Sequence, residues 1–300
     1  MNLAKGLKNI VIATDLNSRS EAALDYARKL AKAYGARLVL AHGIDPLECA
    51  VVDAVPEAVL NGLTVEARTA LDKLSGDLLR DGIPSHSEIR QGAVANLLLD
   101  VIGQYDAGLI VIGTKGLDGA GPVVVGALAE DLVRRSSCPV LAVAEDWNAG
   151  EFRPEPGGPV LLAMEKNEAA PGAVKAAYSL AQTFGRTLLV LHVRTKAEAA
   201  NEPNPCANLL DDFDLPTDGE VEVRCIAKEG NPAEAIAAGI AENRPCVLVA
   251  GVKRTSNTPG PHGTAFALLA VSRVPVLLVP PETVTLRDKL EACAVASACA

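Results

Sequence analysis

The sequence predicts an α/β fold of two tandem doubly wound domains, each a five-stranded parallel sheet with helices on both faces. Short apolar strand patterns alternate with helical patterns of ten or more residues along the 300-residue chain, which is typical of parallel sheets with crossover helices. Hydrophobic residues make up 49% of the chain and aromatic residues only 3%, so strands covered on both faces by small-residue helices are favoured over a β-sandwich. The third observation is an internal repeat.

Residues 9–42 reappear at 159–192, 150 positions later. The matched pairs are Ala13/Ala163, Ala23/Ala173, Ala27/Ala177, Leu30/Leu180, Gly35/Gly185, Leu38/Leu188 and His42/His192. The offset falls to 138 at Gly92/Gly230 and Gly113/Gly251, and to 136 at Pro139/Pro275. Strands are retained while loops shorten, so we interpret the chain as a duplication of one domain followed by divergence.

The first half begins with the strand pattern KNIVIAT, followed by an amphipathic helix capped by Ser18 or Ser20 and ended by Gly35. The elements expected after this helix, in order, are a strand ARLVLAH, a helix at 57–81, a strand SHSEIRQG, a helix at 93–103, a strand at 107–113, a glycine-rich loop at 114–123, a helix at 124–136 and a strand at 139–143. Parallel strands place their carboxyl ends together, so Asp15 and the glycine-rich loop are expected at one edge of the sheet.

Glycine and proline gather in the stretch DWNAGEFRPEPGGP, which predicts an interdomain linker. We expect a domain at 1–148, a linker at 149–158, a second domain at 159–281 and a tail at 282–300. The second half repeats the order of elements, but the span between its second and third strands is short and rich in proline. It therefore lacks room for a full second helix.

Charge and cysteine content exclude several classes of function. The formal net charge of −9 and the pI near 5.1 oppose binding to nucleic acid or to anionic lipid. The chain has no apolar run of about 18 residues and enters a strand pattern at its start, so we expect a cytoplasmic protein without a membrane segment. The seven cysteines are expected to be reduced, with Cys138, Cys225 and Cys246 as buried filler.

Three glycines, Gly113, Gly116 and Gly126, form a G-x-x-G-x9-G motif after the strand pattern DAGLIVIGT. Glycines let the main chain approach phosphate oxygens, and the helix that starts near Gly126 offers N–H groups and a favourable dipole to an anion. Asp15, at the tip of a central strand, can accept hydrogen bonds from a ribose or a base. A strand before, a helix after and an aspartate nearby together indicate a nucleotide site.

The segments ATD at 13–15, GLIVIGTKG at 108–116 and CPVLAV at 138–143, with Gly126, resemble the universal stress protein family. The resemblance covers nearly the whole chain as a tandem pair. It implies a strand order of 3-2-1-4-5, no chemistry common to all members and one subgroup that binds ATP. It also implies pairing through the last strands PVLAV and PVLLV, either as an internal pseudo-dimer or as a homodimer.

The resemblance implies ATP or AMP in the first half and no catalytic residues. A divalent cation such as Mg²⁺ would offset the repulsion between a triphosphate and a carboxylate of the loop, and no histidine pair has metal-binding spacing. The implied nucleotide-binding residues are Ala13, Thr14, Asp15, Gly43, Gly113, Lys115, Gly116, Gly126, Ala127 and Leu128. Three departures weaken the match. Ala127 replaces the family's serine or threonine, Asp118 adds a carboxylate to the loop, and Gly43 replaces a valine, which removes a side-chain wall.

The second half departs further from the family pattern. Arg254 replaces the middle glycine, eight residues instead of nine precede Gly263, and Glu165 replaces the aspartate. A bulky side chain therefore fills the phosphate approach. The basic loop formed with Lys253 and His262 leaves binding of a smaller anion open.

Three functions remain as alternatives. The first is a non-catalytic stress-response protein that binds ATP or AMP in its first half, and the second is a nucleotide-free scaffold or protein-interaction module with degenerate sites. The third, an ATP-using enzyme of a related class, is disfavoured because S-G-G-x-D-S, H-I-G-H, Walker and G-x-S-x-G motifs are missing. The repeated His42 and His192 are best explained by packing or a hydrogen bond at a strand end.

Overall fold

The computed structural model describes residues 7–17, 20–46, 56–114, 127–147, 158–165, 169–194, 213, 215–216, 219–252, 267–269 and 272–281. Strands and helices alternate along this part of the chain, as the apolar patterns predict. The first half, in the order of the chain, consists of β1 (Asn9–Ala13), α2 (Glu21–Tyr34), β2 (Arg37–Ile44), α4 (Glu57–Arg80), β3 (Ser85–Gln91), α5 (Val94–Gln104), β4 (Leu109–Thr114), α6 (Ala127–Arg135) and β5 (Val140–Ala144). Helix α2 ends at Gly35, whose φ of 63° is the left-handed conformation that glycine adopts without strain.

The second half repeats this order with fewer described helices. Its elements are β6 (Val160–Met164), α7 (Ala170–Phe184), β7 (Leu188–Arg194), β8 (Val223–Glu229), α10 (Pro232–Asn243), β9 (Val247–Gly251) and β10 (Val276–Val279). Leu215 and Val221, which precede β8, are buried in the hydrophobic core. The Tyr178 hydroxyl of α7 donates to the Pro216 carbonyl at 3.2 Å, which ties this connection to the helix.

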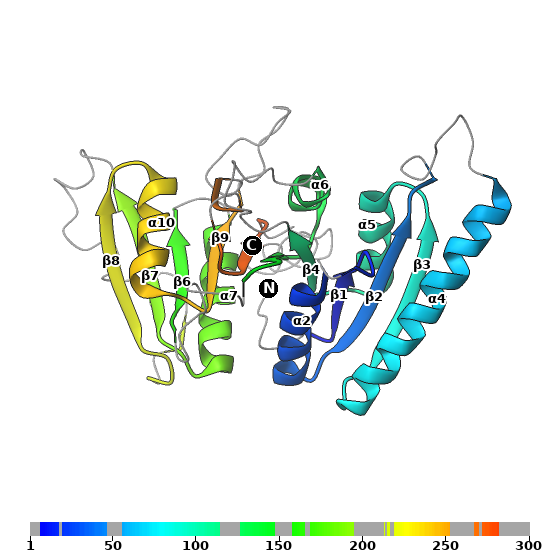
Figure 1. Ribbon diagram of the computed structural model, residues 1–300. Helices are drawn as coiled ribbons and strands as arrows, with labels where there is room; N and C mark the ends of the chain where they lie inside the picture. The colour runs from blue at the N-terminus through cyan, green and yellow to red at the C-terminus, as the bar shows by residue number, and fades with distance from the viewer. Residues whose placement is uncertain are drawn as a thin grey trace, which may run out of the picture.

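All ten strands form one sheet in the order β3-β2-β1-β4-β5-β10-β9-β6-β7-β8 (Figure 1). Neighbouring strands are parallel except at the centre, where β10 pairs antiparallel with β5 through Leu277 and Leu141. Each half therefore has the order 3-2-1-4-5. The predicted α/β fold, with five parallel strands in each half and helices on both faces, is confirmed.

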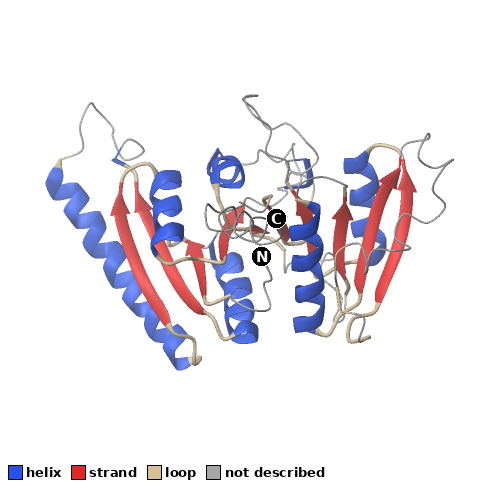
Figure 2. Ribbon diagram, turned by 180° about the vertical axis from the view of Figure 1, so that it is seen from behind, coloured by secondary structure: helices blue, strands red, loops and turns tan. Residues whose placement is uncertain are grey.

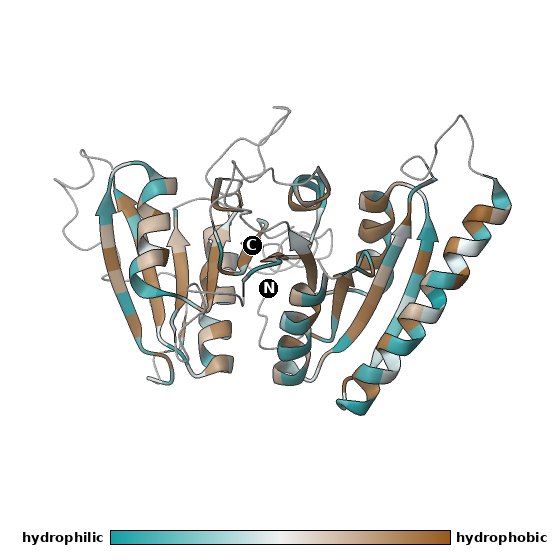
Figure 3. Cartoon of the chain, in the orientation of Figure 1, coloured by the Kyte–Doolittle hydropathy of each residue, from teal (hydrophilic) through white to brown (hydrophobic). Residues whose placement is uncertain are grey.

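Two hydrophobic cores lie on opposite faces of the sheet, and each continues through both halves. Figure 2 shows the helices that cover the sheet. One core packs the sheet against α2, α4 and α7, and the other packs it against α5, α6 and α10. Alternate residues of β1 enter different cores, since Ile10 and Ile12 face the first and Val11 faces the second. The strands are accordingly apolar on both faces, as buried parallel strands are, whereas α2 and α4 carry many hydrophilic residues (Figure 3).

The carboxyl ends of the outer strands of both halves lie on the same side of the molecule, although β5 and β10 are antiparallel. Figure 1 shows the arrowheads of β2, β3, β7 and β8 at the top, and the view from behind agrees. Sheets twist by roughly 20° per strand on average, and a twist of this size accumulated across ten strands would turn the outer strands of the two halves into a common direction. The regions where ligands bind in such sheets therefore face one side.

Helix α2 forms much of the contact between the halves. The Tyr26 hydroxyl donates to the Cys246 carbonyl at 3.4 Å, and the Tyr34 hydroxyl donates to the Ser179 carbonyl at 3.5 Å. The chain's single tryptophan, Trp147, packs edge-on against Tyr26 with 5.2 Å between ring centroids, and the Lys29 ammonium lies 4.8 Å from the Trp147 ring. Burial raises the pKa of Tyr26 well above its ordinary value, so its hydroxyl stays protonated at neutral pH.

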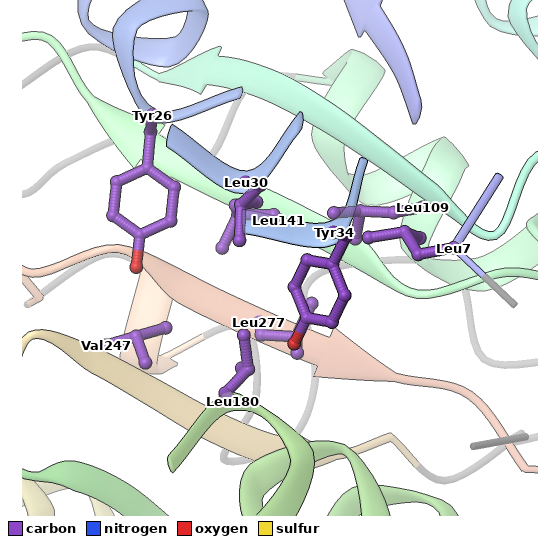
Figure 4. Close-up of a pocket in the computed structure, with 9 residues that line it drawn as sticks. All are labelled: Leu7, Tyr26, Leu30, Tyr34, Leu109, Leu141, Leu180, Val247 and Leu277. Atoms are coloured by element: carbon purple, nitrogen blue, oxygen red, sulfur yellow. The ribbon is translucent and has the colours of Figure 1, made fainter. Parts of the chain in front are cut away.

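A narrow apolar cavity, partly open to solvent, lies beside these tyrosines between the halves (Figure 4). The residues that line it are Leu7, Tyr26, Leu30, Tyr34, Leu109, Leu141, Leu180, Val247 and Leu277. Figure 4 shows both tyrosines entering from α2 with their hydroxyl groups directed toward the second half. The halves are thus joined by the main-chain pairing of β5 with β10 and by apolar packing, to which the hydroxyl groups of Tyr26 and Tyr34 add long hydrogen bonds.

The described cysteines correct one prediction. Cys225 on β8 is exposed and disulfide-bonded, so the expected buried, reduced thiol is wrong at this position. Cys138 and Cys246 are free, and burial raises the pKa of each thiol to about 11. Among the residues described, no helix combines the length and the apolar character needed to cross a bilayer.

Candidate functional site

The candidate site lies where the direction of strand connections reverses in the first half. β1 pairs with β2 on one side and with β4 on the other, with Ile12 opposite Val111, so the carboxyl ends of β1 and β4 lie at the same edge. The chain leaves β1 for α2 on one face and leaves β4 for α6 on the other face. Open α/β sheets bind ligands at such a switch point.

Several predicted site residues meet at this edge. Ala13 ends β1 and packs against the same core as Leu128 of α6, while Asp15 is exposed just beyond the strand. Gly113 lies near the end of β4, is exposed, and pairs with Val143 of β5. Asp15 and Gly113 thus lie on either side of the switch point.

The tip of β1 is ordered by local hydrogen bonds. Thr14 is buried, and its main-chain N–H donates to the Ala41 carbonyl of β2 at 3.0 Å. The Thr14 hydroxyl accepts the Leu16 N–H at 3.0 Å and lies 2.9 Å from the Ser20 hydroxyl. One carboxylate oxygen of Asp15, Oδ1, accepts the Asn17 N–H at 3.0 Å.

Gly43 allows helix α5 to approach the end of β2. A Cβ atom on Gly43 would lie 2.8 Å from Leu97 Cδ1 and 3.1 Å from Val94 Cγ2, so a larger residue at this position would require these side chains of α5 to move. The absent side-chain wall noted in the sequence is therefore replaced by apolar atoms of α5. The main-chain groups of Gly43 remain in β2, opposite Arg90 of β3.

The glycine-rich loop is only partly within the described residues. Gly113 is described, but Lys115, Gly116 and Gly126 are not, and of Ala127 only its place at the start of α6 is described. The structure thus brings together six of the predicted residues: Ala13, Thr14, Asp15, Gly43, Gly113 and Leu128. The nucleotide-binding role of all ten predicted residues stays a prediction.

The repeated histidines make equivalent contacts in the two halves. His42 Nδ1 lies 2.9 Å from the Thr14 carbonyl oxygen, and His192 Nδ1 lies 3.2 Å from the Met164 carbonyl oxygen. For a neutral ring this contact requires the tautomer in which Nδ1 carries the proton and donates. Each histidine therefore fastens the end of the first strand of its half to the second strand.

The second half has a different arrangement at the equivalent edge. Glu165, in place of the aspartate, follows β6 and is exposed. A Cβ atom on Gly251, at the end of β9, would lie only 3.0 Å from the Ala169 Cβ. The start of α7 therefore packs directly against the end of β9. The residues after Val252 that were predicted to form a basic loop, Lys253, Arg254, His262, Gly263 and Thr264, lie outside the described residues.

Sequence reasoning missed two features of the β1 tip. Leu16 has a φ of 61°, a left-handed conformation that leucine rarely adopts. Ser20 does occupy the N-cap position of α2, as the pattern predicts, but its side chain makes no capping hydrogen bond. The closeness of Thr14 and Ser20, six residues apart around a turn, is the only signal in the sequence that points to their contact.

Within the described ranges, no group of three or more histidine, cysteine, aspartate or glutamate side chains could hold a metal ion.

Comparison with known proteins agrees with this geometry. Residues 6–144 match the Universal stress protein family. A universal stress protein of Methanocaldococcus jannaschii is 30% identical over 138 residues, which cover 45% of this chain and 81% of that protein. One from Mycolicibacterium smegmatis is 29% identical over 194 residues, and the match spans 61% of this chain and 63% of that relative, slightly less than two thirds of its length.

Among solved structures, a universal stress protein from Archaeoglobus fulgidus superposes with a TM-score of 0.73 at 17% identity, covering 91% of this chain and 98% of that chain. A functionally unknown protein from Pseudomonas aeruginosa superposes with a TM-score of 0.66, covering 94% of this chain and 95% of that one. At such identities these structures show the fold alone. The sequence relatives show more, and this chain belongs to the universal stress protein family.

Proposed function

We propose that this chain is a non-catalytic stress-response protein that binds ATP or AMP in its first half. The observation that carries the proposal is the placement of Asp15 and Gly113 on either side of the switch point between β1 and β4. Asp15 is exposed, and its Oδ2 receives no hydrogen bond from the part of the chain that the structure describes. That oxygen is available to accept a hydrogen bond from a ribose hydroxyl or a base amino group.

Different residues at this edge would bind the phosphates and the base of the nucleotide. The main chain near Gly113, Gly116 and Gly126 would hold the phosphates, aided by the N-terminal N–H groups of α6. Apolar side chains of Val94 and Leu97 border Gly43, whose main chain would face the base. A Mg²⁺ ion, when bound with ATP, would offset the repulsion between the phosphates and nearby carboxylates.

The contacts of His42, the candidate general base, favour a binding protein over an enzyme. His42 contacts the Thr14 carbonyl, and this contact recurs in the second half, where the acidic residue and the glycine motif are altered. A histidine kept for joining strands in both halves is better explained by structure than by proton transfer. We therefore infer that nucleotide occupancy, and not turnover, is the functional state.

Binding is tested by thermal unfolding with and without Mg-ATP, Mg-ADP or AMP. A ligand at 100 times its Kd stabilises the native state by about 2.7 kcal/mol, which gives a clear rise in melting temperature. We expect Gly113→Val and Gly126→Val to abolish this rise, because a branched side chain blocks the approach of phosphate. Arg254→Gly, in the second half, is the matched control and should leave the rise unchanged.

Two results would count against the proposal. No stabilisation of the wild-type protein by any of the three nucleotides at millimolar concentration would leave the nucleotide-free scaffold as the better account. Equal loss in the first-half and second-half variants would show that the binding site is wrongly assigned to one half. Native mass spectrometry of the purified chain adds a direct reading of retained ligand and of assembly mass.

We also propose that the chain is a tandem pair of domains at 1–148 and 159–281, joined by a linker at 149–158 and followed by a tail at 282–300. Support comes from the identical strand order in both halves and from the pairing of β5 with β10 within one chain. Because this pairing uses the strand edges through which two separate copies would otherwise join, an internal pseudo-dimer is favoured over a homodimer through the last strands. The net charge of −9 disfavours partners that carry many negative charges, such as nucleic acid or an anionic membrane surface.

A further inference from the structure

A chain of hydroxyl groups joins the tip of β1 to the start of α2. The Leu16 N–H donates to Thr14 Oγ1 at 3.0 Å, Thr14 Oγ1 lies 2.9 Å from Ser20 Oγ, and Ser20 Oγ donates to the Asn17 carbonyl at 3.0 Å. Since the single Ser20 proton goes to Asn17, the Thr14 hydroxyl must be the donor to Ser20. All donors then point one way along the chain, an arrangement in which each bond strengthens the next.

Ser20 makes these bonds in place of its usual one. Serine at an N-cap normally accepts a main-chain N–H from the first turn of its helix and stabilises the helix in this way. Here Ser20 occupies the N-cap of α2 without such a bond, and its hydroxyl is buried against Thr14 instead. The Ser20 side chain thus contacts the tip of β1 and does not cap α2.

The same turn holds a strained residue beside the proposed ligand-binding acid. Leu16, between Asp15 and Asn17, has a φ of 61°. A left-handed leucine persists only where its surroundings hold it, and such residues are concentrated at functional sites. Here the Thr14 hydroxyl holds the Leu16 N–H, and the Asp15 carboxylate holds the Asn17 N–H.

We propose that Thr14 and Ser20 are positioning residues that fix the Asp15 carboxylate for ligand binding. The hydroxyl chain keeps Leu16 in its left-handed conformation, and this conformation sets the direction of the neighbouring Asp15 side chain. The bond to Oδ1 fixes the orientation of the carboxylate and leaves Oδ2 to accept a hydrogen bond from a ligand. This inference rests on the proposed nucleotide-binding function and identifies the residues that orient the Asp15 carboxylate.

The second half supplies a natural comparison. The positions 150 residues after Thr14 and Ser20 are Met164 and Ala170, which have no hydroxyl group. The bond from His192 to the Met164 carbonyl is nevertheless kept. The histidine contact therefore belongs to the shared fold, whereas the hydroxyl chain occurs only beside the half that keeps the aspartate and the glycine motif.

Titration calorimetry with Mg-ATP on the full chain tests the inference. We expect Thr14→Val, which keeps the side-chain shape, and Ser20→Ala to weaken ATP binding by about tenfold each. Thr14→Ser restores the hydroxyl and should bind within about twofold of wild type, as a positioning role requires. The matched control is Ser136→Ala, which removes another buried hydroxyl, bonded to the Cys138 carbonyl at 2.8 Å before β5, and should lower the melting temperature without changing ATP affinity.

A second measurement, on nucleotide-free protein, separates this inference from the proposed function. Hydrogen exchange at the Leu16 and Asn17 amides should accelerate at least tenfold in Thr14→Val and remain slow in Ser136→Ala, because only the first variant loses the bond that holds the turn. Absence of ATP binding in wild type, with the accelerated exchange still present, refutes the nucleotide function alone. Unchanged exchange, or unchanged ATP affinity in Thr14→Val when wild type binds, refutes the positioning role.

Discussion

The two halves of the molecule share the contacts that assemble the sheet. In each half a histidine joins the first two strands, through the Thr14 carbonyl in one and the Met164 carbonyl in the other. A buried serine precedes the last strand in each, where Ser136 donates to the Cys138 carbonyl and Ser272 to the Val274 carbonyl, both at 2.8 Å. These bonds satisfy polar groups inside a core that water cannot reach, so their loss would be costly in either half.

The halves differ at the edges that could bind ligand. The first half has an aspartate, a hydroxyl chain and a left-handed leucine at its first strand tip, while the second has Met164 and Ala170 at the equivalent hydroxyl positions. At the second edge the start of α7 packs within 3.0 Å of the position that a Cβ of Gly251 would take. Divergence after duplication thus preserved the histidine and serine hydrogen bonds that stabilise the sheet and altered the residues at the edge where a ligand could bind.

Removing a buried strand leucine from either half is expected to produce the largest effect. Leu38 and Leu188 occupy equivalent positions and are fully buried in the same core. Because that core runs through both halves, Leu38→Ala and Leu188→Ala should each lower the free energy of unfolding by about 2 to 5 kcal/mol. Guanidinium unfolding followed by both Trp147 fluorescence and circular dichroism should give coincident transitions in each variant.

The control for these variants is Val59→Ala on α4, whose side chain is 48% exposed and should change stability by about 0.5 kcal/mol or less. If one leucine variant instead produced two separate transitions, the halves would be independent folding units. Each half would then be stabilised by its own core and not by one core shared by both halves.

A charged cluster on the outer strand of the first half is centred on Glu88, and the equivalent position of the second half has no charge. Glu88 of β3 accepts the Tyr105 hydroxyl and lies 3.4 Å from both Arg90 Nε and His86 Nε2, whereas the position 138 residues later is Ile226. Partial burial alone would raise the pKa of Glu88, but the bonds from Tyr105 and Arg90 outweigh it and lower this pKa. Burial and the bond to Glu88 raise the pKa of Tyr105 to about 12.

These shifts predict two limits of stability with pH. A carboxyl whose pKa is lowered on folding stabilises the protein above its unfolded pKa, so the contribution of Glu88 is lost as the pH falls below about 4.5. A tyrosine whose pKa is raised on folding stabilises it below its unfolded pKa, so the contribution of Tyr105 is lost between pH 10 and about 12. Urea unfolding across pH should show both losses, and Tyr105→Phe should flatten the alkaline limb.

Glu88→Gln should flatten the acid limb in the same experiment, since the amide does not titrate. The control is Glu222→Gln, because Arg224 and Thr187 lower the pKa of that fully exposed carboxyl in the second half, where solvent screens the interaction. An acid limb that Glu222→Gln flattens more than Glu88→Gln would show that the cluster of the first half does not distinguish the two halves.

The fold could be predicted because its causes are local and repeated. Apolar alternation marks the strands, Gly35 ends α2 at the predicted residue, and the predicted helix at 57–81 differs by one residue from α4. The ends of strands are harder to predict because hydrogen bonds between strands distant in sequence determine them. β4, for example, begins two residues after the predicted start at 107. The place of Asp15 followed from strand topology alone.

The details of the β1 tip could not be predicted in this way. The left-handed Leu16 depends on a hydroxyl from Thr14, and the pattern assigned Ser20 to a helix cap that its side chain does not form. These features arise from side chains that meet only after the turn has folded. The disulfide at Cys225 was missed because seven cysteines at irregular spacing do not determine a pairing.

The hydroxyl groups at the contact between the halves are expected to have the smallest effect. Tyr34 of α2 donates over a long 3.5 Å to the Ser179 carbonyl, and the position 150 residues later is Phe184, which has no hydroxyl. Such a long bond contributes little, so Tyr34→Phe should lower the free energy of unfolding by about 0.5 kcal/mol or less. Leu30→Ala, in the same helix and lining the same cavity, should cost about 2 to 5 kcal/mol.

Chemical denaturation followed by Trp147 fluorescence measures both variants at the contact itself, because Trp147 packs against Tyr26 of the same helix. A small effect of Tyr34→Phe beside a large effect of Leu30→Ala means that apolar packing holds the halves together and that the tyrosine hydroxyl is dispensable, as Phe184 suggests. A loss above about 2 kcal/mol in Tyr34→Phe, which is more than a neutral hydrogen bond normally contributes, would instead show that this hydroxyl is needed for the contact between the halves.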